Sequence, residues 1–443
     1  MSLSSAAATL LAISIFTSAG LRAQNPLRAG AGKAEVVLPA EAFPVDGFTR
    51  QHDPMMARTL LLDDGQVKLG IVVVDQTSLS NMAIDRFKKM VSQIAQMPTA
   101  NIVVVAEHGF STPHMMLRPD ADDAARQRVQ LLERGFDAAI RQSAEAAQAA
   151  LQPARLSSGC GISRVGVNRD VPTAHGWWLG ANDAAFSDSA LCELRADSLA
   201  GKPLAVVMNY GVQSAVMDGS RTAKGERLVS ADLAGAASRL VEERLGGGAV
   251  ALFLIGAAGD QVPFLQANRH VVAADGTVSR IDLHEEGFTL LALQGERLGE
   301  DALRVAGSLS PLEAPRLNID RMSMRVGTQQ PSMGLPSGPV TSYEYKLAAE
   351  EDAPAVFLTI GDLAIVGVQA ELSARTGALI REASPYANTM VATLVDGAAK
   401  YMADAISYDR FTYEARNSHF TKGSAEKLAG FIGEQLRKLH QAR

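Results

Sequence analysis

Three side chains that can bind a metal or move a proton stand just after apolar runs of the chain. His108, Asp260 and Glu371 each follow a run that is rich in β-branched residues. A buried strand delivers polar groups in this way to the edge of a sheet, and imidazole and carboxylate groups serve there as zinc ligands or as general acids and bases. The same residues also have structural explanations that need no functional site. His108 could belong to a hydrogen-bonded turn, and Glu371 could favour a helix N-terminus.

A second histidine, His114, lies close to His108 in the segment Glu107 to His114. Their spacing is not that of two residues on one helix face, so it is a weak signal for a metal site. The chain has no GxSxG, HExxH or P-loop motif, and no GxGxxG after a strand. Generic motifs therefore do not identify an enzyme class.

The stretch from Asn209 to Pro263 predicts a strand, a helix and a second strand. Apolar β-branched runs at its two ends stop at Gly or small polar residues, and residues 233–245 have apolar and charged faces at helical spacing. The strand ends of such an α/β unit line a crevice. We expect the functional site at this crevice.

Other apolar runs predict strands and helices over most of the chain. Hairpins or strand pairs are expected over 56–75, 191–209 and 356–368, and a buried strand over 102–106. Helices are expected over 82–96, 119–151, 295–309, 372–383 and 424–440. Two segments rich in Gly, Asn or polar residues, 173–188 and 268–282, are expected to be irregular loops.

The composition is that of a globular chain with a large core. Of 443 residues, 47% are hydrophobic and 20% charged, and the net charge is −6. An acidic chain without a block of Lys or Arg lacks the electrostatic footprint of a nucleic-acid-binding protein. The length predicts two or three domains, or fewer if they are large α/β domains. The sequence gives no indication of oligomeric state.

The N-terminus predicts export. Residues 4–20 carry no charge and lead into small residues near Ala23, so residues 1–23 are interpreted as a signal peptide of a secreted or periplasmic protein. The basic n-region is missing, and a helical or disordered N-terminus is the alternative. No later run is long enough to span a membrane. Cys160 and Cys192 fit either a disulfide or two buried thiols.

Several short motifs, taken in order, resemble the neutral/alkaline (non-lysosomal) ceramidase family. The resemblance covers the chain from about Ala31 to its C-terminus and is to the N-terminal catalytic region and its shorter bacterial relatives. The segments that carry it are 31–36, 52–58, Gly166-Val167-Asn168-Arg169, Val229-Ser230-Ala231-Asp232 with Gly235, Gly256-Ala257-Ala258-Gly259-Asp260, and Gly397-Ala398-Ala399-Lys400-Tyr401 with Tyr413-Glu414.

The resemblance implies a zinc amidohydrolase whose metal is held by two His, one Glu and one Tyr. His108, Glu371 and Tyr401 match three of these ligands. Gln213 stands where the family has its second metal His, and a neutral amide oxygen is a poor zinc ligand. His114 is a candidate substitute ligand. The resemblance places Asn168, Arg169 and Asp260 in the catalytic region.

Two further positions depart from the family pattern. Phe110 replaces a His, and Val262 replaces the Ser that follows Gly-Asp in the family. Val262 can neither polarise a carbonyl nor accept a proton, so hydrolysis would depend on metal-bound water, with a carboxylate or Tyr401 assisting proton transfer.

The expected fold is α/β, with a mixed central sheet flanked by helices. It is expected to fill residues 24–443, with a core over 31–310, a C-terminal part over 311–443 that completes the site, and no C-terminal β-sandwich. The first functional hypothesis is an exported zinc-dependent amidohydrolase acting on a small-molecule or lipid-like N-acyl amide, for which a ceramide-like lipid is a candidate. The second is a catalytically inactive relative that binds a ligand or partner in the same cleft, and the third is another hydrolase chemistry in this pocket.

Overall fold

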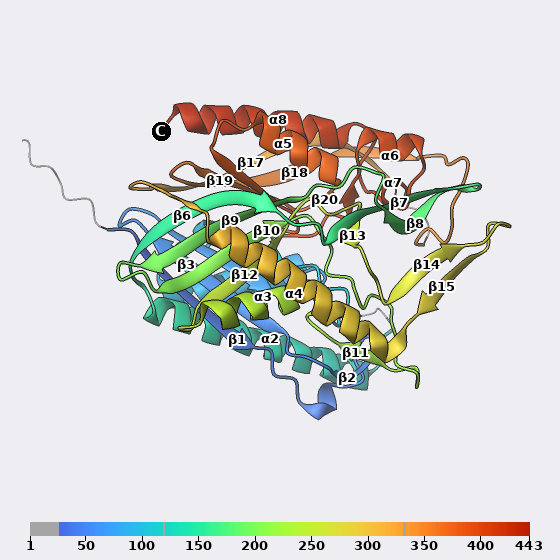
Figure 1. Ribbon diagram of the computed structural model, residues 1–443, viewed down its shortest axis with the longest axis horizontal. Helices are drawn as coiled ribbons and strands as arrows, with labels where there is room; N and C mark the ends of the chain where they lie inside the picture. Colours follow the sequence, from blue (N-terminus) through green and yellow to red (C-terminus); the bar gives the residue numbers. More distant parts are fainter. Residues whose placement is uncertain (1–25, 118–119, 331–333) are drawn as a thin grey trace, which may run out of the picture.

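The computed structural model describes residues 26–117, 120–330 and 334–443. The segment interpreted as a signal peptide, residues 1–23, lies outside the described residues. The fold is mixed α/β, as the sequence predicts. Figure 1 shows it in layers, with helices α5 and α8 above the strands and α2 below them.

The largest sheet has nine strands in the order β12-β10-β9-β6-β1-β3-β4-β5, with β16 paired to β6. Pairs β4·β5 and β10·β12 are parallel, and the other pairs are antiparallel. The strands are β1 Arg28–Glu35, β3 Met56–Asp63, β4 Lys68–Val74, β5 Ile102–Ala106, β6 Gln152–Ile162, β9 Ala190–Ser198, β10 Pro203–Tyr210, β12 Val250–Ile255 and β16 Ser310–Pro311.

Strand β12 packs against β3, β4 and β5, although it is not hydrogen-bonded to any of them. The sheet therefore bends back on itself. The strands at the bend, β1 and β6, share only a short ladder at Arg28 and Ala29. Nearly continuous apolar runs suit strands that are covered on both faces. β4, β5 and β12 have this character, and their side chains are buried along almost their whole length.

A second sheet, of order β17-β18-β19-β21, lies beside strands β6, β9 and β10. Its strands are β17 Leu317–Gln329, β18 Leu347–Ile360, β19 Leu363–Val368 and β21 Asn388–Ala392. Small sheets are formed by β2 Phe48–Gln51 with β11 Arg227–Val229, by β20 Glu371–Leu372 with β22 Tyr401–Met402, by β13 Gln261–Pro263 with β7 Gly166–Thr173 and β8 Gly176–Asn182, and by β14 Asn268–Val272 with β15 Val278–Asp282.

The helices cover the layers. They are α1 Asn81–Ala95, α2 Asp123–Ala149, α3 Asp232–Leu245, α4 Gly287–Ala306, α5 Ala374–Ala383, α6 Ala405–Asp409, α7 Tyr413–Arg416 and α8 Ser424–Gln441, with short 3-10 turns at Ala40–Ala42, Thr99–Asn101 and His284–Glu286. Helix α2 packs on β1 and β3, α3 on β12, and α4 on β9. Gly32 lets α2 approach, since a Cβ there would lie 2.2 Å from the Ser143 carbonyl oxygen.

The strand–helix–strand unit is present as β10, α3 and β12, and the predicted pairs β3·β4, β9·β10 and β18·β19 all form. Two loop predictions are wrong. Segment 173–188 contains β8, which forms a hairpin with β7, and segment 268–282 is the β14–β15 hairpin. Their strands are half-exposed on both faces, so the apolar alternation that marks a strand is missing. Figure 1 shows both hairpins on the right.

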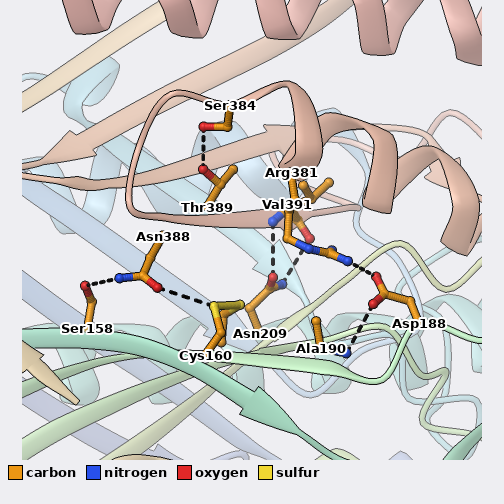
Figure 2. Close-up of a disulfide and its surroundings, with 11 residues drawn as sticks. Ser158, Cys160, Asp188, Ala190, Asn209, Arg381, Ser384, Asn388, Thr389 and Val391 are labelled. Atoms are coloured by element: carbon orange, nitrogen blue, oxygen red, sulfur yellow. Dashed lines mark hydrogen bonds and ion pairs between the residues drawn. A yellow bond between two sulfur atoms is a disulfide. The ribbon is translucent and has the colours of Figure 1, made fainter.

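Cys160 and Cys192, for which the sequence leaves two possibilities, form a disulfide between the paired strands β6 and β9. Figure 2 shows Asn388 beside the disulfide and, further along, Arg381 in an ion pair with Asp188. Asn209 ties β10 to β21 through two hydrogen bonds with the Val391 backbone. Among the described residues, no helix combines the length and hydropathy needed to cross a membrane.

Candidate functional site

His108 and Glu371 form a buried pair at the end of β5. The His108 Nε2 and Glu371 Oε2 atoms are 2.9 Å apart, and His108 Nδ1 lies 2.7 Å from the Thr77 carbonyl oxygen. Because a carbonyl oxygen only accepts, Nδ1 carries a proton, and the lone pair of a neutral Nε2 would face a carboxylate oxygen. The pair therefore requires a shared proton or another cation between the two atoms. His108 has a positive φ of 66°, a turn conformation that turns the chain out of the strand.

Tyr401 lies next to Glu371 because strands β20 and β22 pair in parallel with these two residues in register. Burial, and then the Glu371 charge, raises the pKa of Tyr401, although Arg169 opposes them. Burial also acts to raise the pKa of Glu371, but the charge and hydrogen bond of His108, together with the charges of Arg169 and Lys400, leave that pKa below its ordinary value. At neutral pH the cluster therefore contains an ionised Glu371 and a neutral phenol.

Arg169, on β7, is a buried cation of the site. Its Nε donates to Glu414 Oε1 at 2.5 Å and its Nη1 donates to Gln213 Oε1 at 2.9 Å. The guanidinium lies 5.3 Å from the ring centre of Tyr401 and 5.5 Å from that of Tyr413, within cation–π range. Burial acts to lower the pKa of Arg169, but Glu414 and the tyrosines raise it overall, so the charge is permanent.

Asn168 and Asp260 form hydrogen bonds that support the position of Arg169. Asn168 Nδ2 donates to Asp260 Oδ2 at 3.0 Å, and the Ala374 backbone N–H donates to Asp260 Oδ1 at 2.7 Å. Burial raises the pKa of Asp260 to about 7, despite these hydrogen bonds. Both carboxyl oxygens are occupied by structural donors that join β7 to the start of α5. Asp260 therefore positions the site and does not line its cavity.

Asp170 is a site residue that the sequence does not point to. It is buried, and its pKa is raised well above the ordinary value by burial and then by the neighbouring Glu414 carboxyl. A protonated Asp170 can donate to Glu414, which satisfies the carboxylate on the side away from Arg169. Only its place beside Asn168 and Arg169 in the sequence could have suggested it.

Part of this cluster borders a cavity of roughly 380 Å³, which we call the site cavity. Polar and aromatic side chains from distant segments line it, among them Arg169, Gln213, Tyr401, Tyr413, Trp178 and His270. Of the three positions that match the family's metal ligands, Tyr401 is the one that lines the cavity. Trp178 and His270 come from the two hairpins that were expected to be loops, which explains why the sequence did not single them out.

His114, the candidate substitute ligand, is not brought to this cluster. Its Nδ1 atom lies 2.6 Å from Asp46 Oδ2, and both side chains are 42% exposed. The pair lines a different hollow, between the 44–47 loop and the start of α2.

The donor set fits a metal ion in part. The lone pairs of His108 Nε2 and Glu371 Oε2 converge on a point where a cation can replace the shared proton, and Tyr401 stands beside them. Gln213 does not fit, because its Oε1 accepts from Arg169 and its Nε2 donates to the Ala258 carbonyl at 3.0 Å. In the described part of the chain, no three His, Cys, Asp or Glu side chains form a metal-binding group.

The architecture defines a mixed α/β protein with a cavity at the strand ends, and solved structures share it. No family model matches the chain, and no curated protein matches it in sequence. Neutral ceramidase from Pseudomonas aeruginosa is similar in structure, with a TM-score of 0.70 and 17% identity over 94% of this chain and 75% of that one. A ceramidase complexed with C2 gives a TM-score of 0.68 and 18% identity over 94% and 76%. The chain therefore has a ceramidase-like fold.

Proposed function

We propose that this chain is a ceramidase-like hydrolase that acts on an N-acyl amide bound in the site cavity, with a zinc ion held by His108, Glu371 and Tyr401. The pair formed by His108 and Glu371 is the observation that carries the proposal, because two buried donors converge on one cation position at the end of a buried strand. Three protein ligands with an open position are a common catalytic zinc arrangement.

In such a site a bound zinc ion supplies Lewis acidity and a water of lowered pKa. The chain's own residues bind and orient the ligand. Arg169 presents a permanent positive charge at the cavity wall, where it can stabilise negative charge on a carbonyl oxygen. Glu414 and Gln213 hold the guanidinium in place. Tyr401 lies beside Arg169 at the cavity wall, where it would hold the zinc ion next to the bound ligand.

Zinc content of the purified protein tests this proposal, with His108→Ala beside the wild type. We expect about one zinc per chain in the wild type, in line with a single catalytic site, and loss of that zinc in the variant. His114→Ala is the matched control, since it removes the same ring outside the cluster. Release of fatty acid from N-acyl amides by the zinc-loaded protein then tests hydrolysis. A wild type that stays zinc-free after reconstitution contradicts the metal part of the proposal.

A second candidate function is ligand binding without catalysis in the same cavity. Two observations favour it. The amide of Gln213 is held away from the metal position by Arg169 and Ala258, and Val262 is a buried apolar residue at the cavity. Saturable binding of an N-acyl amide with no zinc and no fatty-acid release would establish this function instead.

Export is a further part of the proposal and rests on the uncharged segment 4–20. N-terminal sequencing of the protein recovered from the source cells tests it. A mature chain that begins near residue 24 supports export, and an intact Met1 contradicts it.

A further inference from the structure

A second arginine lines the site cavity. Arg280 lies on β15 and borders the cavity together with Arg169 of β7. In the β14–β15 ladder it stands directly across from His270, which lines the same cavity. The site cavity is therefore bordered by two guanidinium groups, and the proposed function assigns a role to only one of them, Arg169.

The guanidinium of Arg280 is anchored through one of its nitrogens. Nη2 donates to the carbonyl oxygens of Asp218 and Asn268, at 3.2 Å and 3.0 Å, and within the described part of the chain Nη1 and Nε form no hydrogen bond. The Asp218 carboxylate lies 3.5 Å from Nη2, and the two side chains are 35% and 33% exposed. An ion pair of this length and exposure contributes little. Arg280 therefore keeps both donors and charge for a ligand.

The two arginines differ in how far the protein already neutralises them. Arg169 donates to Glu414 at 2.5 Å and to Gln213 at 2.9 Å, and its side chain is almost completely buried. Of the described residues that line the site cavity, Asp218 is the single acidic one. The positive charge that remains available to a ligand in this cavity is therefore mainly that of Arg280.

The neighbouring ring of His270 shows that this charge acts inside the cavity. Burial, and then the charges of Arg280 and Arg169, lowers the pKa of His270 to about 4. The ring is therefore neutral at pH 7, and its Nδ1 has no hydrogen-bond partner among the described residues. Both guanidinium groups thus act on one ring, and a positive potential at this wall favours an anionic ligand group.

Much of the remaining wall is apolar. The described residues that form it include Phe110, Trp178, Leu179, Val262, Leu335 and Pro336. Ligand sites commonly combine such a surface with a few polar groups that fix the orientation of the ligand. An amphiphile with an anionic end matches this cavity, because its apolar part is removed from water while its charge has a partner.

We propose that Arg280 binds a carboxylate on the amine half of the ligand, so that the favoured ligands are N-acyl amino acids. This inference rests on the proposed function and names the substrate class of the same cavity. A hydrogen bond from a guanidinium to a carboxylate is charge-assisted, and it is stronger than one to a neutral hydroxyl. Arg280 therefore determines specificity, while the reacting amide lies at Arg169 and Tyr401.

A matched pair of ligands tests the inference. N-octanoylglycine and N-octanoylethanolamine share the acyl chain and the amide, and differ in a carboxylate against a hydroxymethyl group. Isothermal titration calorimetry measures the binding of each to the full chain, with a chelator present so that metal-dependent cleavage does not alter the ligands. We expect the glycine conjugate to bind about tenfold more tightly at low ionic strength, and this preference to shrink as salt is added.

Variants at the anionic subsite separate its charge from its fold. Arg280→Gln should weaken the glycine conjugate about tenfold and leave the ethanolamine conjugate within about twofold. Arg280→Lys retains the charge and should keep most of the preference. Asp218→Asn removes the competing carboxylate and should strengthen the glycine conjugate about threefold. Arg269→Gln is the matched control, because Arg269 is an exposed arginine of β14 that does not line the site cavity.

Equal affinities of the two conjugates for the wild type would overturn the inference. A preference that survives in a folded Arg280→Gln, or the absence of binding by both conjugates, would overturn it too. If Arg280→Gln does not fold, a wild-type preference that is insensitive to salt and to Asp218→Asn would have the same consequence.

The proposed function is judged separately, by zinc content and fatty-acid release of the metal-loaded protein. Fatty-acid release by a zinc-loaded chain that binds both conjugates equally would support the proposed function and overturn this inference. A carboxylate preference in a chain that binds no zinc and releases no fatty acid would support the inference together with the non-catalytic function.

Discussion

The histidines of two His–carboxylate pairs lie close together in the sequence, but the pairs differ in almost every other respect. In the first, His108 Nε2 is 2.9 Å from Glu371 Oε2, both residues are buried, and the partners come from distant parts of the chain. In the second, His114 Nδ1 is 2.6 Å from Asp46 Oδ2, and both side chains are 42% exposed. The shorter contact is in the exposed pair, which lies outside the candidate functional site.

The difference shows that burial and position give such a pair its chemistry. An exposed ion pair is screened by water and contributes little, whereas a buried pair depends strongly on its partner. His108 stands at the end of a buried strand, where Thr77 fixes its tautomer. His114 lies at the surface beside the 44–47 loop.

The largest expected effect comes from His108→Ala. The substitution leaves Glu371 buried without its partner, so we expect a loss of about 3–5 kcal/mol in the free energy of unfolding at neutral pH. Urea denaturation followed by circular dichroism measures it. A loss as small as that of an exposed pair would show that water reaches Glu371 freely, and would remove the contrast between the two pairs.

Asp260 extends the comparison to a carboxyl that is buried without a cation bonded to it. Its folded pKa of about 7 lies above the unfolded value of 3.8. Below the unfolded pKa, Asp260 is protonated in both states and its contribution is fully present. As pH rises towards 7, the unfolded state loses the proton first, so stability falls, by up to about 4 kcal/mol for this residue.

Urea midpoints of the wild type and Asp260→Asn, measured between pH 4 and pH 8, test this sign. We expect the wild type to lose stability relative to the variant as pH rises, because other groups titrate alike in both. A wild type that gains stability relative to the variant over this range would contradict the raised pKa.

Sequence reasoning located the buried strands and the residues at their ends. The runs over β5 and β12 are apolar throughout because both faces of each strand are covered, and such runs are recognisable without a structure. His108 and Asp260 follow from them. Tyr401 follows from the family resemblance alone, since the two-residue strand β22 has no periodicity.

The two hairpins and the hydrogen-bond partners of the polar site residues could not be predicted from such sequence patterns. In β8 only Trp178 is buried, and β15 has no buried residue, so neither strand shows alternation. The choice of Arg169 as the partner of Gln213 depends on how β7 and the loop after β10 meet in space. The raised pKa of Asp170 depends in part on Glu414, which is distant in the sequence and lies beside Asp170 only in the folded chain.

Gln213→His tests whether the buried pair can become a complete metal site. An imidazole in place of the amide adds a strong zinc ligand, and we expect zinc affinity to rise on the order of tenfold or more, which is 1.36 kcal/mol of binding free energy. Competition with a chromogenic chelator measures it. Gln213→Ala is the control, because it also removes the acceptor for Arg169 but adds no ligand. Equal affinities in the two variants would place position 213 outside the metal's reach.

The smallest effect is expected from His114→Ala. Both partners of the exposed pair are screened by water, so the loss of unfolding free energy should be below about 1 kcal/mol, and lower still in high salt. Burial acts to raise the pKa of Asp46, but the hydrogen bonds and charge of His114 lower it overall. The pair's contribution is therefore present above the unfolded Asp pKa and is lost as pH falls, so wild type and variant should converge near pH 3. Urea denaturation at pH 7 and pH 3 measures both values. A loss as large as that of His108→Ala would mean that the 44–47 loop depends on His114 for its fold, and that exposure does not separate the two pairs.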